Sequence, residues 1–108
     1  MEFNEYQAKA TTTAIYPGRG ASLGLFYTSL GLTNEAGEVA GKVKKLIRDG
    51  EFAFDERAVA DELSDVLWYA AMVANEIGYS LEDIAQINVA KLSDRKDRGV
   101  LQGSGDTR

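Results

Sequence analysis

The chain has 108 residues, a net charge of −5 and a hydrophobic fraction of 44%, with neither cysteine nor histidine. This length suits one folded domain, and the two missing residue types exclude disulfides, thiolate or imidazole metal sites and Ser-His-Asp catalysis. The negative charge argues against binding to nucleic-acid polymers through a basic surface. No apolar run approaches the roughly 18 residues that span a membrane, and the start lacks signal-peptide features, so we expect a cytoplasmic protein without a membrane partner.

The first expected helix begins near Phe3 and frays before Ala14, because Thr11-Thr12-Thr13 is β-branched and polar. Tyr16-Pro17-Gly18-Arg19-Gly20 follows, with the only proline of the chain, and predicts a loop. Two interpretations of this loop stay open: an exposed turn, or a segment whose tyrosine and arginine contact a ligand.

A long helix is expected from residue 22 to residue 49, with Ser22 as its N-cap and Gly50 as its stop. Glu35 and Glu38 lie on the flank of its apolar stripe, at the border between core and solvent. Glycine costs roughly 1 kcal/mol relative to alanine inside a helix. Close helix packing and a slot for a ligand are the two explanations for the glycines at 24, 31, 37 and 41.

The next helix is expected to follow a cap at Asp55 and to end near Ile77, before Gly78. Glu62 and Asp65 flank its apolar face, much as the first acidic pair flanks its own. The face that we expect to be buried consists of Val59, Leu63, Val66, Leu67, Ala70, Val73, Ala74 and Ile77.

The last expected helix begins after Ser80, with Asp83 at the position of a capping-box acid. Asn88, Lys91 and Arg95 follow at steps of three and four residues and form one polar, cationic stripe. Because no strand is evident, we predict an all-α fold of four helices in one domain, residues 1–99. Residues 100–108 are small and polar and predict a flexible C-terminal tail.

The two acidic pairs, Glu35 with Glu38 and Glu62 with Asp65, are each three residues apart and so share a helix face. With imidazole and thiolate missing, oxygen is the chief ligand, which favours magnesium, manganese or calcium. Four carboxylates from two helices suit a cage for two or three hard cations that bind a triphosphate. Side chains suited to the phosphates or the sugar are Lys91, Arg95, Lys42, Lys45 and Asn88.

A structural interpretation of these residues stays open beside the functional one. Acids three apart are frequent on solvated helix faces, and cations near the end of a helix are favoured by its dipole. In that case the chain is a helical oligomerisation module or a partner-binding module.

The motifs resemble those of the MazG-like nucleoside triphosphate pyrophosphohydrolases. Glu35-x-x-Glu38 and Glu62-x-x-Asp65, with 23 residues between them, are similar to the two metal-binding motifs of that family. Asn88-x-x-Lys91-Leu92-x-x-Arg95 resembles its third motif, and Phe3-x-x-Tyr6-Gln7 resembles its usual start. The likeness covers residues from about 3 to 99.

This resemblance implies a four-helix MazG-like bundle completed by dimerisation, as a homodimer or a homotetramer with sites near the subunit interface. It also implies Mg²⁺-dependent cleavage of an NTP or dNTP into the monophosphate and pyrophosphate, with Mn²⁺ as a substitute ion. By the same resemblance the metal ligands are Glu35, Glu38, Glu62 and Asp65, and Glu38 also orients or deprotonates the attacking water. Residues implied to contact sugar or phosphates are Tyr69, Asn88, Lys91 and Arg95, and those expected at the base are Gln7, Tyr16 and Arg19.

Two alternatives accompany this hypothesis. The related phosphoribosyl-ATP pyrophosphohydrolases use a similar acidic helix pair. A non-catalytic helical oligomer that binds metal or nucleotide without hydrolysis is the other.

Overall fold

The computed structural model describes residues 1–52 and 54–108 of the chain. Its elements are α1 (Phe3–Thr11), α2 (Ser22–Asp49), the short 3-10 helix η1 (Glu51–Ala53), α3 (Glu56–Glu76) and α4 (Leu81–Asp97). No strand occurs among the described residues, so the predicted all-α class and the four predicted helices are confirmed. Within the same residues, no helix combines the length and apolar character needed to cross a membrane.

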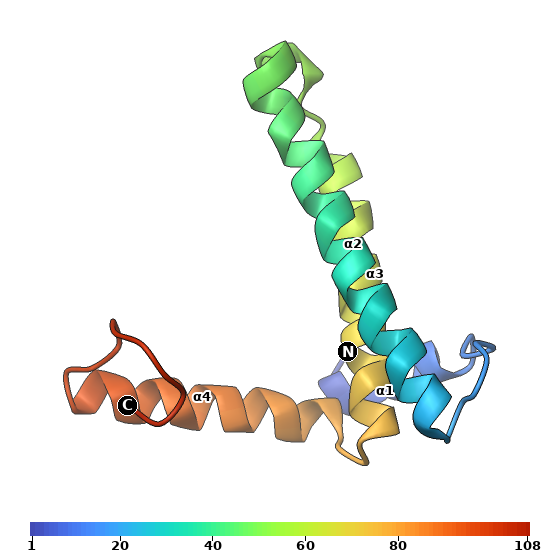
Figure 1. The fold of residues 1–108 in the computed structure, drawn as a ribbon, viewed down its shortest axis with the longest axis vertical. Helices are drawn as coiled ribbons and strands as arrows, with labels where there is room; N and C mark the ends of the chain where they lie inside the picture. Colours follow the sequence, from blue (N-terminus) through green and yellow to red (C-terminus); the bar gives the residue numbers. More distant parts are fainter.

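The helices are arranged as an open L (Figure 1). α2 and α3 form one long antiparallel hairpin with η1 at its tip, α1 packs at the base of the hairpin, and α4 projects from that base. The Cα radius of gyration is 16.6 Å, well above the roughly 13 Å of a compact domain of this length. A single chain therefore does not form the closed bundle by itself.

Most helix ends follow the predicted local chemistry. The Asp55 side chain accepts hydrogen bonds from two backbone N–H groups at the start of α3, and the Ser80 hydroxyl accepts one at the start of α4. Gly50 and Gly78 take positive φ angles of 87° and 78° where α2 and α3 end. The prediction of Ser22 as an N-cap was wrong: α2 begins at Ser22 itself, and the capping position holds Ala21, which offers no side-chain acceptor.

The core lies at the base of the hairpin, where α1 crosses α3 and the start of α4. Its buried apolar side chains are Ala10, Ala14, Ala71, Met72 and Leu81. Gln7 is buried among them and ties three helices together. Its Nε2 donates to Asn75 Oδ1 at 2.8 Å and to the Tyr79 carbonyl at 3.2 Å, while its Oε1 accepts from the Leu81 N–H at 2.7 Å.

The expected buried face of α3 is only partly covered. Leu63 and Leu67 are 55% and 41% exposed, and Ile77 is also exposed. The reason is geometric: α2 packs along one side of α3, α1 covers only its C-terminal half, and α4 turns away from the hairpin. The prediction that this face is buried was therefore wrong for Leu63, Leu67 and Ile77 in the single chain.

Two glycines allow α2 and α3 to approach closely. A Cβ atom on Gly31 would collide with the ring of Tyr69. One on Gly24 would collide with the Gly18 carbonyl of the preceding loop and would meet the Glu76 carboxylate at 2.7 Å. Nothing lies within 4 Å of a Cβ built on Gly37 or Gly41. Close packing thus explains the first two glycines and leaves the other two unexplained.

This difference predicts opposite effects of adding one methyl group to the same helix. Gly31→Ala should lower the free energy of unfolding by about 1–3 kcal/mol, because the Tyr69 ring must move in a packed contact. Gly37→Ala should be neutral or stabilising by up to about 1 kcal/mol, through helix propensity alone. Urea denaturation of both variants checks this, and equal effects would contradict the close approach.

Candidate metal and nucleotide site

Three carboxylates from two helices converge along the hairpin. Glu35 comes from α2, while Glu62 and Asp65 stand three residues apart on one face of α3. One oxygen from each lies within 4.8 Å of the other two. Hard divalent cations bind carboxylate oxygens clustered in this way, so the geometry is suited to such an ion.

Burial and repulsion among these acids both act on the pKa of Glu35. Partial burial raises the pKa of the Glu35 carboxyl, and the negative charges of Asp65, Glu62 and Glu38 raise it further. Lys42 offsets part of the charge, since its Nζ lies 3.6 Å from Glu62 Oε1. A bound cation would relieve the remaining repulsion.

Glu38 lies one helical turn from Glu35 and is exposed. Its charge acts on Glu35, but its carboxylate does not belong to the converging group of three. The structure thus brings together three of the four predicted metal ligands, and the roles of all four stay predictions.

Tyr69 stands beside the acids, one turn after Asp65 on α3. Burial is the largest of the effects that raise the pKa of its phenol. The neighbouring Tyr27 and the charges of Glu35 and Asp65 raise this pKa further. Lys45 follows Lys42 by three residues on α2, nearer the tip of the hairpin. Tyr69 and Lys42 are therefore the predicted sugar- or phosphate-binding residues that one chain places next to the acids.

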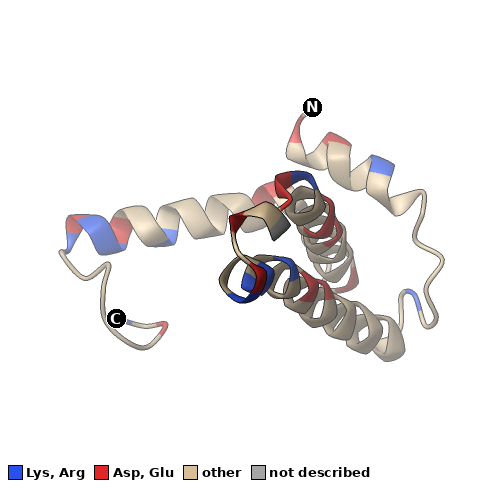
Figure 2. Ribbon diagram, turned by 90° about the horizontal axis from the view of Figure 1, so that it is seen from above, with Lys and Arg blue, Asp and Glu red and all other residues tan. Residues whose placement is uncertain are grey.

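The predicted cationic stripe of α4 lies apart from these acids. Figure 2 shows acidic segments on both helices of the hairpin and basic segments at its tip and on the outer half of α4. Among the described residues α4 contacts α1 and α3 but not α2. Asn88 and Lys91 are exposed on α4, whereas Arg95 is only 5% exposed.

Arg95 is covered by the C-terminal segment, which folds back on the end of α4. Its Nη2 donates to the Asp106 carbonyl at 2.7 Å. The Arg108 guanidinium donates to the Leu101 and Gly105 carbonyls at 3.0 and 2.7 Å, and Arg98 Nη2 donates to the Arg108 carbonyl at 2.8 Å. Flexibility of residues 100–108 stays a prediction.

The residues expected at the base are not gathered around one point. Gln7 uses its amide in the core contacts described above, and Arg19 Nη1 donates to the Ala14 carbonyl at 3.1 Å. Of these three residues, Tyr16 is the one that contacts the group of aromatic side chains to which Tyr69 belongs. It packs edge-on against Trp68, with 6.3 Å between ring centroids.

Sequence reasoning missed two residues of this region, Glu76 and Tyr27. Glu76 accepts hydrogen bonds from the Tyr16 hydroxyl and from the Gly20 N–H, the latter at 3.1 Å to each oxygen, and so holds the loop after α1 onto the end of α3. Two residues eleven positions apart lie on nearly the same side of a helix. The spacing between Asp65 and Glu76 could therefore have indicated that Glu76 lies on the same side of α3 as the acids. Tyr27 stands one turn before Gly31, the glycine that faces Tyr69.

An all-α hairpin that gathers carboxylates from both of its helices defines a class of helical proteins suited to metal binding. Residues 27–100 match the family described as the MazG nucleotide pyrophosphohydrolase domain. Over the full length of both chains, this protein is 47% identical to the Gene 37 protein of Mycobacterium phage L5. No solved structure matches the chain. The chain belongs to the MazG nucleotide pyrophosphohydrolase family, which confirms the resemblance found in its motifs.

The bond between Tyr16 and Glu76 predicts a pH-dependent contribution to stability. Burial, and then the hydrogen bond and charge of Glu76, raise the pKa of Tyr16 to about 12. Because folding favours the protonated phenol, this contribution is complete below the unfolded pKa of about 10 and is lost as the pH rises through about 12.

Tyr16→Phe should therefore lower the free energy of unfolding by about 1–2 kcal/mol at pH 8. The difference from the wild type should shrink between pH 10 and pH 12. Guanidinium denaturation of both proteins at several pH values measures it, and a difference that stays constant with pH would contradict the assignment.

Proposed function

We propose that this protein is a Mg²⁺-dependent nucleotide pyrophosphohydrolase, which cleaves an NTP or dNTP into the (d)NMP and pyrophosphate. Membership of the MazG family supports the reaction class. The observation that carries the metal dependence is the convergence of Glu35, Glu62 and Asp65, whose oxygens lie within 4.8 Å of one another. All three fall inside the matched residues.

In the proposed reaction Glu35, Glu62 and Asp65 would hold the metal together with Glu38. Each site would take two or three Mg²⁺ ions, with Mn²⁺ as a substitute. Bound divalent ions neutralise phosphate charge and lower the pKa of a bound water. Glu38 accepts a proton from the water that attacks the α-phosphorus, and pyrophosphate leaves with the electron pair of the broken P–O bond. The exposure of Glu38 leaves its carboxylate accessible for this role.

Lys42 and Lys45 are the cations of the hairpin proposed to meet the phosphates, and Tyr69 is proposed to meet the sugar. Asn88, Lys91 and Arg95 belong to a helix that does not reach the acids of its own chain. We therefore propose that α4 of a second copy brings this stripe to the site. Arg95 joins only when the C-terminal segment releases it, because its guanidinium is bonded to the Asp106 carbonyl.

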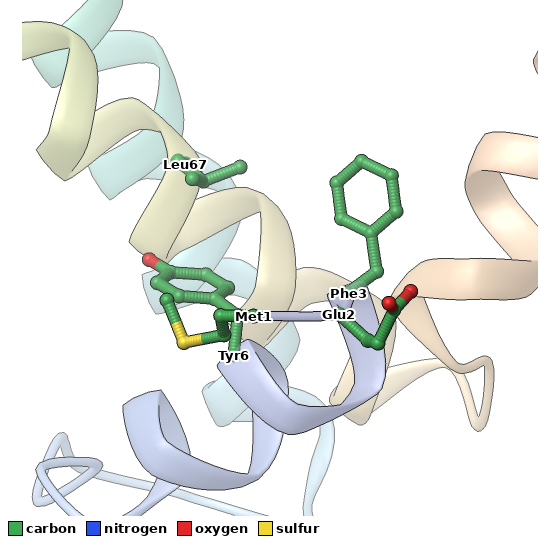
Figure 3. A pocket seen from close by; sticks show the side chains of 5 residues that line it. All are labelled: Met1, Glu2, Phe3, Tyr6 and Leu67. Atoms are coloured by element: carbon green, nitrogen blue, oxygen red, sulfur yellow. The ribbon is translucent and has the colours of Figure 1, made fainter.

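Uncovered apolar side chains support assembly as a homodimer or homotetramer. Leu63 and Leu67 lie on the open side of α3, and Ile87 and Val89 are exposed on α4. At the start of α1, a pocket of about 300 Å³ is lined by Met1, Glu2, Phe3, Tyr6 and Leu67, which are apolar except for Glu2 and the Tyr6 hydroxyl (Figure 3). Uncovered large apolar side chains that cluster on one side of a helix are typical of protein–protein interfaces, so a second copy is the proposed cover.

A charge placed on this surface should dissociate the assembly. Leu63→Glu should shift the protein toward the monomer, because an ionised carboxylate is costly to bury. Ile47→Glu is the matched control: Ile47 is 90% exposed and lies near the tip of the hairpin, away from this surface. Sedimentation velocity over a range of concentrations measures the change, and a wild-type protein that stays monomeric would contradict the proposal.

The function is tested with a panel of NTPs, dNTPs and phosphoribosyl-ATP, each with Mg²⁺, by measuring monophosphate and pyrophosphate. Glu38→Gln should lower kcat by about 100-fold or more, since general-base catalysis contributes that much, and should leave the helical circular dichroism unchanged. No turnover of any substrate by the folded, Mg²⁺-loaded protein would sink the proposal. Nucleotide binding without product would instead identify a non-catalytic binder.

Two aspartates one turn apart on α3 distinguish the loss of a metal ligand from the loss of any one negative charge. Asp65→Asn should abolish both turnover and the rise in Tm on adding Mg²⁺, because a ligand that prefers the folded state stabilises it. Asp61→Asn should preserve both. Asp61 is exposed and, among the described residues, forms an ion pair with Arg57 alone, at 2.7 Å; such surface pairs contribute little.

A further inference from the structure

Residues 99–108 fold back over the outer end of α4 and form a cap on it (Figure 1). Gly99 and Gly105 take positive φ angles of 71° and 86°, which turn the chain back toward the helix. The Val100 N–H donates to the Arg95 carbonyl at 2.8 Å, so the first turn of the cap is joined to the last turn of α4. We call residues 99–108 the C-terminal cap.

The Arg108 side chain fastens this cap. Its Nε donates to the Val100 carbonyl at 3.2 Å. Its two Nη atoms donate to the Gly105 and Leu101 carbonyls at 2.7 and 3.0 Å. Gly103 lies against the same side chain, because a Cβ built on it would meet Arg108 Cδ at 2.9 Å. One guanidinium therefore joins both ends of the cap.

Arg95 is the side chain that the cap hides. It is 5% exposed, and among the described residues it forms no ion pair. Arginine is almost never so deeply buried unless it is paired. Here the Nη2 atom donates to the Asp106 carbonyl, a neutral acceptor, at 2.7 Å. A phosphate is the stronger partner for a guanidinium, because it is charged and accepts two parallel N–H bonds.

The cap covers one member of the cationic stripe and leaves the others uncovered. Asn88 and Lys91 are exposed on α4, whereas Arg95 lies under the cap. The core lies at the base of the hairpin, and Figure 1 shows the cap at the opposite end of α4. The cap can therefore open without disturbing the core.

We propose that the C-terminal cap is an autoinhibitory element, which withholds Arg95 from the phosphates until a phosphate group displaces the Asp106 carbonyl. The inference rests on the proposed function, which places Arg95 at the phosphates of the substrate. A protein whose binding-competent state is only partly populated binds its ligand more weakly by that fraction. A cap that is closed in about nine molecules of ten thus raises the apparent Kd about tenfold.

The test uses the full chain and inorganic tripolyphosphate with Mg²⁺, a probe that carries phosphates and no base. Arg108→Ala removes three hydrogen bonds of the cap and should lower the Kd, measured by calorimetry, about tenfold. Loss of a positive charge by itself weakens the binding of an anion, so the change in charge cannot produce this gain. Circular dichroism should show the helices unchanged.

Two further variants keep the comparison matched. Gly103 has a φ of 144°, which strains any other residue, so Gly103→Ala should loosen the cap and lower the Kd about threefold. This variant decides the question if Arg108→Ala does not fold. Arg57→Ala removes the same charge from a side chain that is 84% exposed on α3, and it should not lower the Kd.

The gain in affinity should depend on Arg95. In a chain that carries Arg95→Ala, adding Arg108→Ala should leave the Kd unchanged, because the cap then hides no phosphate-binding group. Hydrogen exchange gives a second readout that a purely structural cap would not change. Tripolyphosphate should speed the exchange of residues 99–108 in the wild type, although a ligand that stabilises the folded state ordinarily slows exchange.

The cap proposal is overturned if Arg108→Ala and Gly103→Ala bind tripolyphosphate as the wild type does, or if the gain persists without Arg95. Hydrolysis of a nucleotide by the same proteins leaves the proposed function standing in that case. If the variants follow the expected pattern but no nucleotide is cleaved, the cap stands and the proposed function fails. If none of these proteins binds tripolyphosphate with Mg²⁺, both proposals fall.

Discussion

The close approach of α2 to α3 at Gly31 is the contact on which the rest of the structure depends. The Tyr69 ring lies against bare backbone at this point, and any side chain larger than hydrogen would collide with this ring. Because carboxylate side chains are short, Glu35 can join Glu62 and Asp65 only while the two helices stay this close. The same contact places Tyr69 between the acids, whose charges act on its phenol, and the ring of Trp68. Gly31 lowers the helix propensity of α2, but it allows the close packing that brings the three carboxylates together.

A second constraint acts at the base of the hairpin. Gln7 joins α1, α3 and the start of α4 through buried hydrogen bonds, and Gly78 turns the chain where α3 ends. Together they direct α4 away from α2, so the acids and the cationic stripe of α4 occupy different arms of one chain. The same geometry leaves Leu63 and Leu67 uncovered. The exposed apolar face and the divided site therefore share one structural cause.

Local sequence patterns predicted the features that depend on interactions between residues close together in the chain. The 3.6-residue period located all four helices, side-chain oxygens at Asp55 and Ser80 marked two starts, and Gly50 and Gly78 marked two ends. The signal failed at Ser22, where a good capping residue sits one position inside the helix. It also failed for the buried face of α3. Periodicity shows which side of a helix is apolar, but it does not show whether another element covers that side.

The sequence by itself determined the helices, oxygen as the chief ligand of any metal site and the acids that share a helix face, because these follow from composition and from spacing along one helix. Only the tertiary structure decided which acids converge, since that depends on the distance between α2 and α3. It also decided that Gln7 is buried in the core, and that Tyr16 packs against both Tyr27 and Trp68. Contacts between residues distant in sequence depend on how helices pack, and no local pattern encodes that distance.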